Sequence, residues 1–343
     1  MKTENTQSRW LVFFASLVII LWFSGSALAI DDGARSYWFG REGTNVVSFQ
    51  SLAVDIEASD TQQYGPGQYI YPNADVAADL FIANGVHFFT WLDRPSSLNF
   101  ALAGGNVDAD LNTNLLPSQF LPPGASGSSF SQSSSGYADP TVQLVTNLFG
   151  TPPLRSNVDL LNYEPCFTLD AAVMLAFPIG EYDNKKLINL GQNRWFGRFA
   201  LPMKYHFGAF TPGYRNSFEI TPSIWLFDDN DDFLGRKLEN DPLYQLEAHL
   251  THDFTRNFYG SLDALYRHGF RSEINGTKIG DKIDVGSVGF TMNYQVSDNC
   301  AIRAGYSSNV FGDGDLDTSM FRIQFVFGWL DAMENFKKLT GGH

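Results

Sequence analysis

The sequence has few cysteines and few basic residues. Only 2 of its 343 residues are cysteines, and 23 lysines and arginines stand against 37 aspartates and glutamates, a formal net charge of −14 at pH 7. A chain this acidic lacks the basic surface that nucleic acid or anionic lipid phosphates require, so we expect no nucleic-acid partner. Cys166 and Cys300 lie far apart in strand-like runs whose alternation directs them to opposite faces, which favours free thiols over a disulfide.

Long apolar runs are absent after the N-terminal region. There, Lys2 and Arg9 precede the uncharged run WLVFFASLVIILWF at 10–23, and small residues follow as far as Ala29. A charged start, an apolar stretch and an Ala-x-Ala site are the layout of a cleaved secretory signal. The alternative is an uncleaved anchor helix, because about 20 apolar residues can span a bilayer. We expect a signal peptide at 1–29, cleavage after Ala29, and export of the mature chain.

The mature chain also lacks helical periodicity and an interdomain linker, and shows residue-by-residue alternation instead. In 285–296, VGSVGFTMNYQV, large apolar residues occupy the even positions from Val288 on, and small or polar residues occupy the odd ones. In 321–329, FRIQFVFGW, five large apolar residues share one parity and Arg322 lies on the other. A soluble sandwich alternates too, but its outer face is usually rich in Lys and Glu. Apolar side chains opposite Ser, Gly, Thr, Asn and Gln indicate a barrel wall between lipid and a wet lumen.

The strand count and the connections support the same architecture. From the seventh expected strand on, long connections such as DDNDDFLGRKLEND alternate with short ones such as TRN and SD. Outer-membrane barrels have short periplasmic turns and longer extracellular loops, and an even strand number places both termini at the periplasmic rim. We expect twelve strands, at 44–57, 75–92, 98–104, 137–149, 165–178, 196–207, 217–227, 242–254, 258–270, 283–296, 299–309 and 318–329.

The predicted fold class is therefore all-β, a single transmembrane antiparallel β-barrel in the Gram-negative outer membrane. We expect a periplasmic N-terminal segment at 30–43, the barrel at 44–329 and a periplasmic tail at 330–343. Trp329 is expected at the periplasmic interface. The connection at 151–165 is long where the pattern requires a short turn. The residues expected to face lipid are Phe290, Met292, Tyr294, Ile302, Phe321, Ile323, Phe325, Phe327 and Trp329.

Several phrases resemble one family of exported proteins. They are ARSYWFGREGTN, GYADPTVQLVTNLFGTPPL, FPIGEYDNKKLINLGQNRW, IWLFDDNDDF and DPLYQLEAHLTHDF. In these phrases the chain resembles the family called Putative MetA-pathway of phenol degradation, whose members are exported barrels described as transporters. The resemblance covers most of the mature chain and implies passage of aromatic or other hydrophobic molecules, without implying any catalytic chemistry.

Charged residues on the polar parity near the C-terminal end are candidates for the lumen wall. Opposite charges on neighbouring strands would pair, because a narrow lumen cannot leave charges isolated. The group is either a structural ion-pair network or a constriction that selects what passes. It consists of Glu247, His249, Asp253, Asp263, Arg267, Arg303 and Arg322.

The segment GEYDNKKLINLGQNRW at 180–195 is too long and too distinctive for a plain loop. It contains the main basic group of an acidic protein, flanked by leucine, isoleucine and tryptophan side chains. The segment either folds inward as a gate that contacts solute or lies over the mouth as a packing element. Its candidate residues are Lys185, Lys186, Asn189, Asn193, Arg194 and Trp195.

One acidic loop has the spacing of a calcium site. Asp228, Asn230, Asp232 and Glu239 occupy positions 1, 3, 5 and 12 of the EF-hand loop pattern, but Phe233 stands where the turn requires glycine. Solvated loop tips are the favoured interpretation, and a looser cation site here or at Asp313, Asp315 and Asp317 is the weaker one. We expect no metal and no cofactor.

The sequence has no G-x-S-x-G, H-E-x-x-H, C-x-x-C or phosphate-binding glycine loop. An outer-membrane lipid hydrolase needs a nucleophile and a histidine together on the lipid face. His252 has the outward parity, but no serine is obviously paired with it. We therefore expect no enzyme but a passive channel for small hydrophobic or aromatic solutes, with lipid and solute as partners and an unspecified oligomeric state. The alternative is a structural or adhesive barrel, and a lipid hydrolase is less favoured.

Overall fold

The computed structural model describes residues 32–58, 62–63, 69–70, 74–111, 130–279, 282–312 and 316–330. The expected signal peptide at 1–29, the tail beyond residue 330, and Asp313 and Asp315 lie outside the described residues. Within them, no helix is long and apolar enough to cross a membrane. One short helix, α2 (Asn157–Leu161), is capped by Ser156 and Asp159, whose side chains each accept a hydrogen bond from the other residue's backbone N–H.

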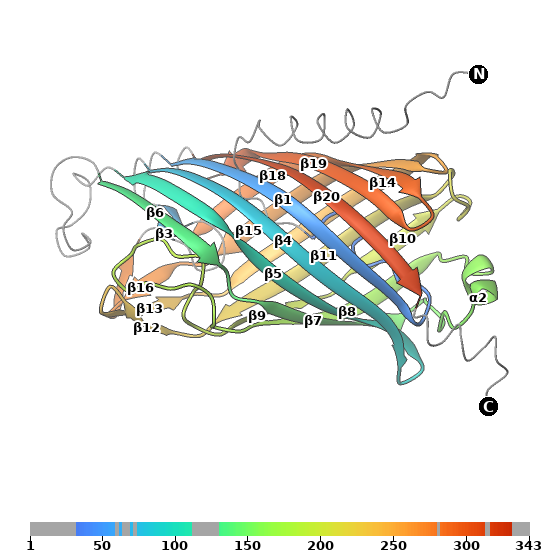
Figure 1. The fold of residues 1–343 in the computed structure, drawn as a ribbon, viewed down its shortest axis with the longest axis horizontal. Coiled ribbons are helices and arrows are strands. Elements are labelled where there is room, and N and C mark those ends of the chain that lie inside the picture. Colours follow the sequence, from blue (N-terminus) through green and yellow to red (C-terminus); the bar gives the residue numbers. More distant parts are fainter. Residues whose placement is uncertain are drawn as a thin grey trace, which may run out of the picture.

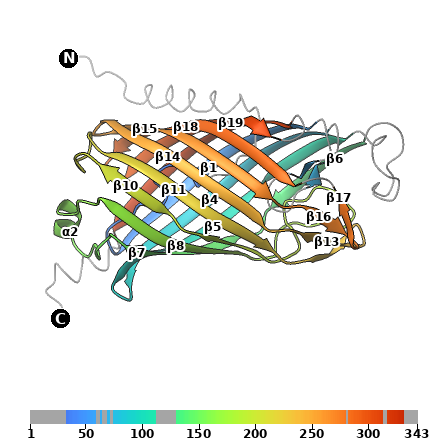
Figure 2. The same ribbon diagram turned by 180° about the vertical axis from the view of Figure 1, so that it is seen from behind.

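The described chain forms a closed antiparallel β-barrel, in which tilted strands run around a single axis (Figures 1 and 2). β6 and β7 pair with the same neighbour, β5, and β9 and β10 both pair with β8 and β11, so each pair acts as one interrupted strand. Counted this way the wall has 12 strands, closed by β20 against β1 from Thr44↔Leu330 to Ala58↔Leu316. The wall segments are β1 (Thr44–Ala58), β4 (Ala74–Trp91), β5 (Arg94–Leu111), β6 (Phe130–Tyr137), β7 (Thr141–Phe149), β8 (Phe167–Ala176), β9 (Phe196–Ala200), β10 (Met203–Phe207), β11 (Asn216–Phe227), β14 (Leu243–Thr255), β15 (Phe258–Gly269), β18 (Ile283–Ser297), β19 (Cys300–Gly312) and β20 (Leu316–Leu330).

Alternation places the apolar side chains outside, as predicted. On β20, Phe321, Phe327 and Trp329 are exposed, whereas Arg322 is buried inside. On β18, Phe290 and Met292 are likewise exposed. Among the described residues no other element covers this face. Large apolar side chains on such a face are suited to lipid, so the structure confirms the predicted transmembrane barrel. Cys166 and Cys300 are free thiols.

The two rims differ in the length of their connections. At one end, here the short-turn rim, the connections include tight turns at 92–93, 256–257 and 298–299 and the α2 segment. Leu92 and Asp93 both have positive φ, 49° and 58°, as a type I′ hairpin turn requires. The opposite end, here the long-loop rim, carries β12 (Asn230–Phe233), β13 (Arg236–Asn240), β16 (Ser272–Ile274) and β17 (Thr277–Ile279), which form a second sheet, and the pair β2 (Gln62–Gln63) and β3 (Tyr69–Ile70).

Proline residues mark the interruptions in the wall. Pro140 lies between β6 and β7, and Pro202 lies between β9 and β10. Proline has no N–H to donate to the ladder, which favours a break in the strand at these two positions. The neighbouring backbone keeps its partners, because Leu201 N donates to Pro222 O at 3.0 Å and Asp170 N donates to Pro202 O at 2.8 Å.

The barrel interior contains an apolar core toward the long-loop rim. Inward side chains of β1 and β4, including Leu52, Val54 and Val76, pack in one cluster with Leu187, Ile188 and Leu190 of the loop between β8 and β9. The same cluster includes Phe233 and Leu238 from β12 and β13, and Phe270 and Ile274 on or beside β16. Burial of this area stabilises the inward position of the loop, at roughly 25 cal/mol per Å² of apolar surface removed from water.

Residues 32–39 lie inside the barrel, which corrects this part of the predicted periplasmic segment at 30–43. Arg41 and Glu42 contact the connection with α2 at the short-turn rim, and residues 30–31 lie outside the described residues. The backbone N–H of Asp32 donates to Glu247 Oε2 on β14 at 3.0 Å, and the Arg35 guanidinium reaches Asp253 on the same strand. An even strand count predicts the rim at which the N-terminal segment joins β1. It does not predict whether the segment extends into the periplasm or folds back into the lumen. Its charged side chains complement charges of the lumen wall, and this complementarity holds it inside.

Candidate functional site: a cavity in the barrel lumen

A cavity of about 560 Å³ lies between the N-terminal segment and the inward-folded loop. Arg35, Tyr37 and Phe39 line it from the N-terminal side, and Leu190 and Gln192 line it from the loop side. Its size lies within the range of small-molecule sites, which is about 300–1,000 Å³. Strands β4 and β5 supply a large part of its apolar wall, through Ala78, Leu80, Ile82, Val86, Phe88, Phe100, Ala101, Ala103 and Val107.

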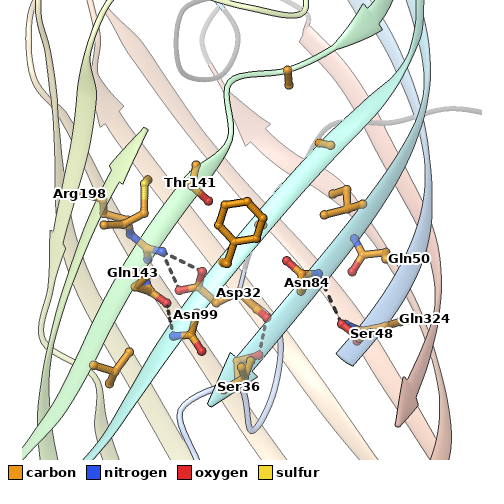
Figure 3. Close-up of a pocket in the computed structure, with 18 of the residues that line it drawn as sticks. Asp32, Ser36, Ser48, Gln50, Asn84, Asn99, Thr141, Gln143, Arg198 and Gln324 are labelled. Atoms are coloured by element: carbon orange, nitrogen blue, oxygen red, sulfur yellow. Dashed lines mark hydrogen bonds and ion pairs between the residues drawn. The ribbon is translucent and has the colours of Figure 1, made fainter. Parts of the chain in front are cut away.

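A belt of amide and hydroxyl side chains crosses the cavity wall from β20 to β7 (Figure 3). Gln324 Nε2 and Asn84 Nδ2 both donate to Ser48 Oγ, at 2.9 and 3.4 Å. Asn99 Nδ2 donates to Gln143 Oε1 at 3.1 Å. These groups lie on neighbouring strands at similar height because the register pairs Ser48 with Asn84 and Asn99 with Gln143. The belt supplies neutral donors and acceptors beside the apolar residues of β4 and β5.

Arg198 on β9 anchors the start of the N-terminal segment. Its Nη1 lies 2.7 Å from Asp32 Oδ2 and its Nη2 lies 3.2 Å from Glu247 Oε1 (Figure 3 shows the Asp32 contacts). The Arg198 side chain is 3% exposed and that of Glu247 is 1% exposed. Tyr37 Oη donates to Asp32 Oδ2 at 2.5 Å. One buried cation therefore joins a wall carboxylate to a carboxylate of the N-terminal segment.

Arg35 forms the second anchor of this segment. Its Nη1 lies 2.6 Å from Asp253 Oδ1, and its guanidinium stacks 4.4 Å from the ring centre of Trp38 and 4.0 Å from that of Tyr259. Trp38 Nε1 donates to Glu219 Oε1 at 2.9 Å, and Glu219 Oε2 accepts the backbone N–H of Arg35 at 3.0 Å. A planar guanidinium is suited to simultaneous ion pairing and aromatic stacking.

Close packing at Gly33 completes the fit. Gly33 has φ of 83°, and a Cβ at this position would lie 2.9 Å from Arg322 Nη2. The positive φ favours glycine here, and a Cβ would force the Arg322 side chain to shift. Arg322 Nη2 also donates to Thr291 Oγ1 at 3.3 Å, and Thr291 Oγ1 donates to Asp263 Oδ2 at 2.6 Å.

The charged lumen residues predicted from sequence separate into two groups. Glu247, His249, Asp253 and Asp263 are buried in polar contacts, with His249 Nδ1 2.8 Å from Asp263 Oδ1 and Nε2 3.6 Å from Glu247 Oε2. None of these four lines the cavity. They form an ion-pair network, which matches the structural interpretation of this group and not the interpretation as a constriction. Arg267, Arg303 and Arg322 do line the cavity.

The 180–195 loop folds inward, but through different residues from those singled out. Lys185 and Asn193 are exposed, Lys186 Nζ donates to Ser133 O at 2.7 Å, and Asn189 accepts the backbone N–H of Asp183 at 2.8 Å. Trp195 is 44% exposed and packs edge-on against Phe177, with ring centres 5.3 Å apart. None of the six predicted loop residues lines the cavity, where Leu190 and Gln192 stand instead.

Two devices hold the loop in place. The carboxylate of Asp139, in the break between β6 and β7, accepts the backbone N–H groups of Gly180 at 2.8 Å and Gln192 at 2.7 Å. Gly180 and Gly191 cross so closely that a Cβ on Gly191 would lie 2.6 Å from the Gly180 carbonyl carbon. The loop is therefore fixed at its base, below the apolar contacts of its tip.

Arg194 belongs to the same base of the loop. Its side chain is buried, and Nη1 donates to Asp228 O at 3.3 Å. Burial lowers the pKa of Arg194 to about 10, and the negative charge of Asp229 opposes this shift. Its guanidinium lies 5.1 Å from the ring centre of Phe227. The residue joins the loop to the end of β11 and does not contact the cavity.

The acidic loop predicted as a weak cation site is used for packing. Asn230 is buried, where its Nδ2 donates to Tyr182 Oη at 3.0 Å and to Gln192 O at 2.9 Å. Asp232 Oδ2 accepts from Asn184, and Glu239 Oε1 lies 2.8 Å from Lys237 Nζ. In the described part of the chain, no three His, Cys, Asp or Glu side chains converge on a metal position.

His252, the histidine on the outward parity, lies near the short-turn rim. Its Nδ1 lies 2.7 Å from Asn216 Oδ1, and its ring contacts Phe254 with ring centres 4.8 Å apart. Its neighbour in this contact is thus an amide and not a nucleophilic hydroxyl.

Sequence reasoning missed the N-terminal segment, the polar belt and the buried cations Arg198 and Lys204. The Lys204 ammonium contacts Asp170 and donates to Tyr37 O at 2.6 Å. Arg198 and Lys204 share the inward parity of their strands, so alternation could have identified them. In ARSYWFG, charge and aromatic residues occur together, which is unusual for a solvated linker and was a usable signal.

The barrel architecture resembles that of one solved outer-membrane channel and, more distantly, those of other barrels. An outer membrane channel from Pseudomonas putida F1 matches with TM-score 0.65 at 16% identity, over 88% of this chain and 100% of that chain. The NanC porin matches with TM-score 0.42 at 8% identity, over 82% and 98%, and a Pseudomonas aeruginosa FadL homologue with 0.33 at 11%, over 83% and 88%. The first of these likenesses shows the fold, that of an outer-membrane β-barrel.

The family follows from the sequence itself. The family model described as Putative MetA-pathway of phenol degradation matches residues 59–313, which is most of the chain. The chain belongs to this family, as its sequence phrases indicated. No curated protein sequence matches it.

Proposed function

We propose that this protein is a passive outer-membrane channel for small apolar or aromatic solutes, which occupy the lumen cavity on their way through. The observation that carries the proposal is the cavity itself, about 560 Å³ inside a transmembrane barrel and bounded by apolar residues of two adjacent strands. Polar channels have wet walls, whereas apolar lining with a few placed polar groups is typical of sites that hold small organic molecules.

Three further points support the proposal. The carboxylates of Glu247, Asp253 and Asp263 have partners within the protein, so they do not make the path strongly acidic. The family description refers to phenol degradation, and a solved barrel of the same fold is described as an outer membrane channel. The sequence contains no nucleotide-binding loop, which suits passive passage.

The test is uptake into proteoliposomes of the purified full chain. We expect phenol and other small aromatic molecules to enter faster than a sugar of similar size, and no turnover of ester substrates. Equal entry of every solute in protein-containing and protein-free liposomes would favour a structural or adhesive barrel, and ester turnover would favour an enzyme.

The 180–195 loop provides a second test. Deletion of Lys185–Asn193 removes the apolar tip that closes the long-loop end of the cavity, so we expect faster entry with reduced discrimination between phenol and sugar. The rate for every solute would stay the same if the loop had no part in passage.

A further inference from the structure

The cavity contains positive charge that the N-terminal segment does not neutralise. Arg198 is paired with Asp32 and Glu247, and Arg35 is paired with Asp253. Arg303 on β19 lines the same cavity, yet among the described residues it makes no hydrogen bond and no ion pair. Its Nε atom is buried without an acceptor. A buried donor without an acceptor is unfavourable, so this position favours any ligand that brings one.

Among the described residues, no carboxylate forms an ion pair with Arg303. Its cross-strand partners are Asn293 on β18 and Gln324 on β20, both neutral. Arg322 lies diagonally across the β19–β20 pair, because Gly305 is opposite Arg322 and Arg303 is opposite Gln324. A second guanidinium on the same face raises the positive potential at this point of the wall.

The rest of the cavity wall determines which chemistry suits the part of a ligand that does not contact Arg303. Ala78, Leu80 and Ile82 on β4 present an apolar surface to the cavity. The carboxylates at the cavity wall are already engaged, Asp32 by Arg198 and Asp139 by two backbone N–H groups of the loop. The site therefore combines a cation, neutral donors and an apolar face, and none of its described lining residues is an unengaged anion that would favour a cationic ligand.

We propose that the cavity selects small amphipathic monoanions, in which one carboxylate binds Arg303 and a compact apolar body lies against β4. This inference rests on the proposed channel function and specifies its substrate class. Guanidinium and carboxylate form charge-assisted, often bidentate hydrogen bonds, which a neutral amide of the same shape cannot match. A neutral aromatic alcohol or amide would still fit the apolar face and could accept a hydrogen bond from Arg303, but without the added strength of a charge-assisted contact.

The test compares benzoate with benzamide, which has nearly the same shape and no charge. Binding to the full chain in detergent is measured by calorimetry at neutral pH, and entry of both probes is measured in proteoliposomes. We expect benzoate to bind roughly tenfold more tightly than benzamide. In Arg303→Gln this preference should disappear, chiefly because benzoate binds more weakly, and Arg303→Lys should retain part of the preference.

A matched control is Arg256→Gln, which removes an arginine that is exposed at the turn between β14 and β15 and leaves the cavity unchanged. It should bind both probes as the parent does. Each variant is first checked for barrel formation by its heat-dependent migration on gels, and Arg303→Lys keeps the test valid if Arg303→Gln does not assemble.

The outcomes separate the two proposals. Loss of the benzoate preference in Arg303→Gln alone supports the inference. If benzamide binds and enters as well as benzoate, or if Arg303→Gln keeps the preference, the monoanion inference is overturned and the channel stands. If neither probe nor any neutral aromatic enters, the channel proposal fails, and the inference that rests on it fails too.

Discussion

The two ends of the lumen cavity are closed by segments of opposite chemistry. At the short-turn end, residues 32–43 are held by buried ion pairs, with Arg198 and Arg35 as the central cations. At the long-loop end, Leu187, Ile188 and Leu190 of the 180–195 loop belong to an apolar core shared with the wall strands. The first closure depends on a few directional contacts and the second on buried area.

This difference indicates how each closure can open. A buried ion pair fixes one geometry, and loss of one partner leaves the other charge without compensation. Apolar packing is less directional, so a loop held by it can shift in small steps while remaining partly buried. We infer that the loop end adapts to solute and that the N-terminal end is the rigid boundary.

The largest expected effect comes from deletion of residues 32–41. The wall from Thr44 to Leu330 closes without them, so we expect a barrel that still assembles and conducts several-fold more current in planar bilayers. Deletion of Lys185–Asn193 should raise conductance less, because the hairpins β12–β13 and β16–β17 remain at that rim. Equal increases from the two deletions would contradict the distinction between the two ends.

The second prediction concerns Arg198→Ala. It leaves the buried Glu247 and the partly exposed Asp32 without their shared cation. Breaking a buried ion pair costs about 3–5 kcal/mol. The measurement is the urea midpoint of unfolding, followed by loss of heat-dependent migration.

The matched control is Arg215→Ala, where Asp253 keeps Arg35 as its partner. We expect a much smaller shift there. Similar midpoints for the two variants would show that the N-terminal segment is not held by Arg198.

The third prediction tests the apolar end. Ile188→Ala removes a buried side chain from the shared core, and such truncations cost about 2–5 kcal/mol where they occur in cores. Because the loop can detach without unfolding the wall, we expect the loss to appear as faster proteolysis within 180–195 and not as a lower urea midpoint. A lower midpoint without faster proteolysis would mean that loop and wall unfold as one unit.

The smallest effect is expected for Trp195→Ala. The side chain is 44% exposed, contacts Phe177 and does not line the cavity. Uptake of phenol and benzoate should therefore stay within error of the parent in proteoliposomes. A clear change in either rate would indicate that Trp195 contacts solute. It would also weaken the assignment of the loop's solute contacts to Leu190 and Gln192.

Much of the barrel could be predicted because alternation is a local property. Strand β20 was predicted at 318–329 and is found at Leu316–Leu330, and the apolar parity from Phe321 to Trp329 faces outward. Residues 196–207 were predicted as one continuous strand. In the structure they form β9 and β10, and Pro202 explains the interruption between them. The long connection at 151–165 remained unexplained by length alone. In the structure it carries α2, and Leu154 O accepts the backbone N–H of Glu42 beside the N-terminal segment.

The site was harder to predict because its parts come from distant segments. Arg303 and Arg322 were identified by parity and do line the cavity, but parity could not distinguish them from Glu247 and Asp253, which share the same inward face. The distinction depends on the N-terminal segment, whose residues lie more than two hundred positions from β14 and cover some inward side chains and not others.

The sequence by itself determined the transmembrane wall, since residue alternation decides locally which side chains meet lipid and which meet the lumen. It also determined the family, through phrases dispersed along the chain. Only the tertiary structure decided what fills the lumen. Whether a charged segment or an apolar loop turns inward depends on partners that closure of the barrel brings within hydrogen-bond or packing distance. No local pattern records those partners, because the contacts exist only after β20 has joined β1.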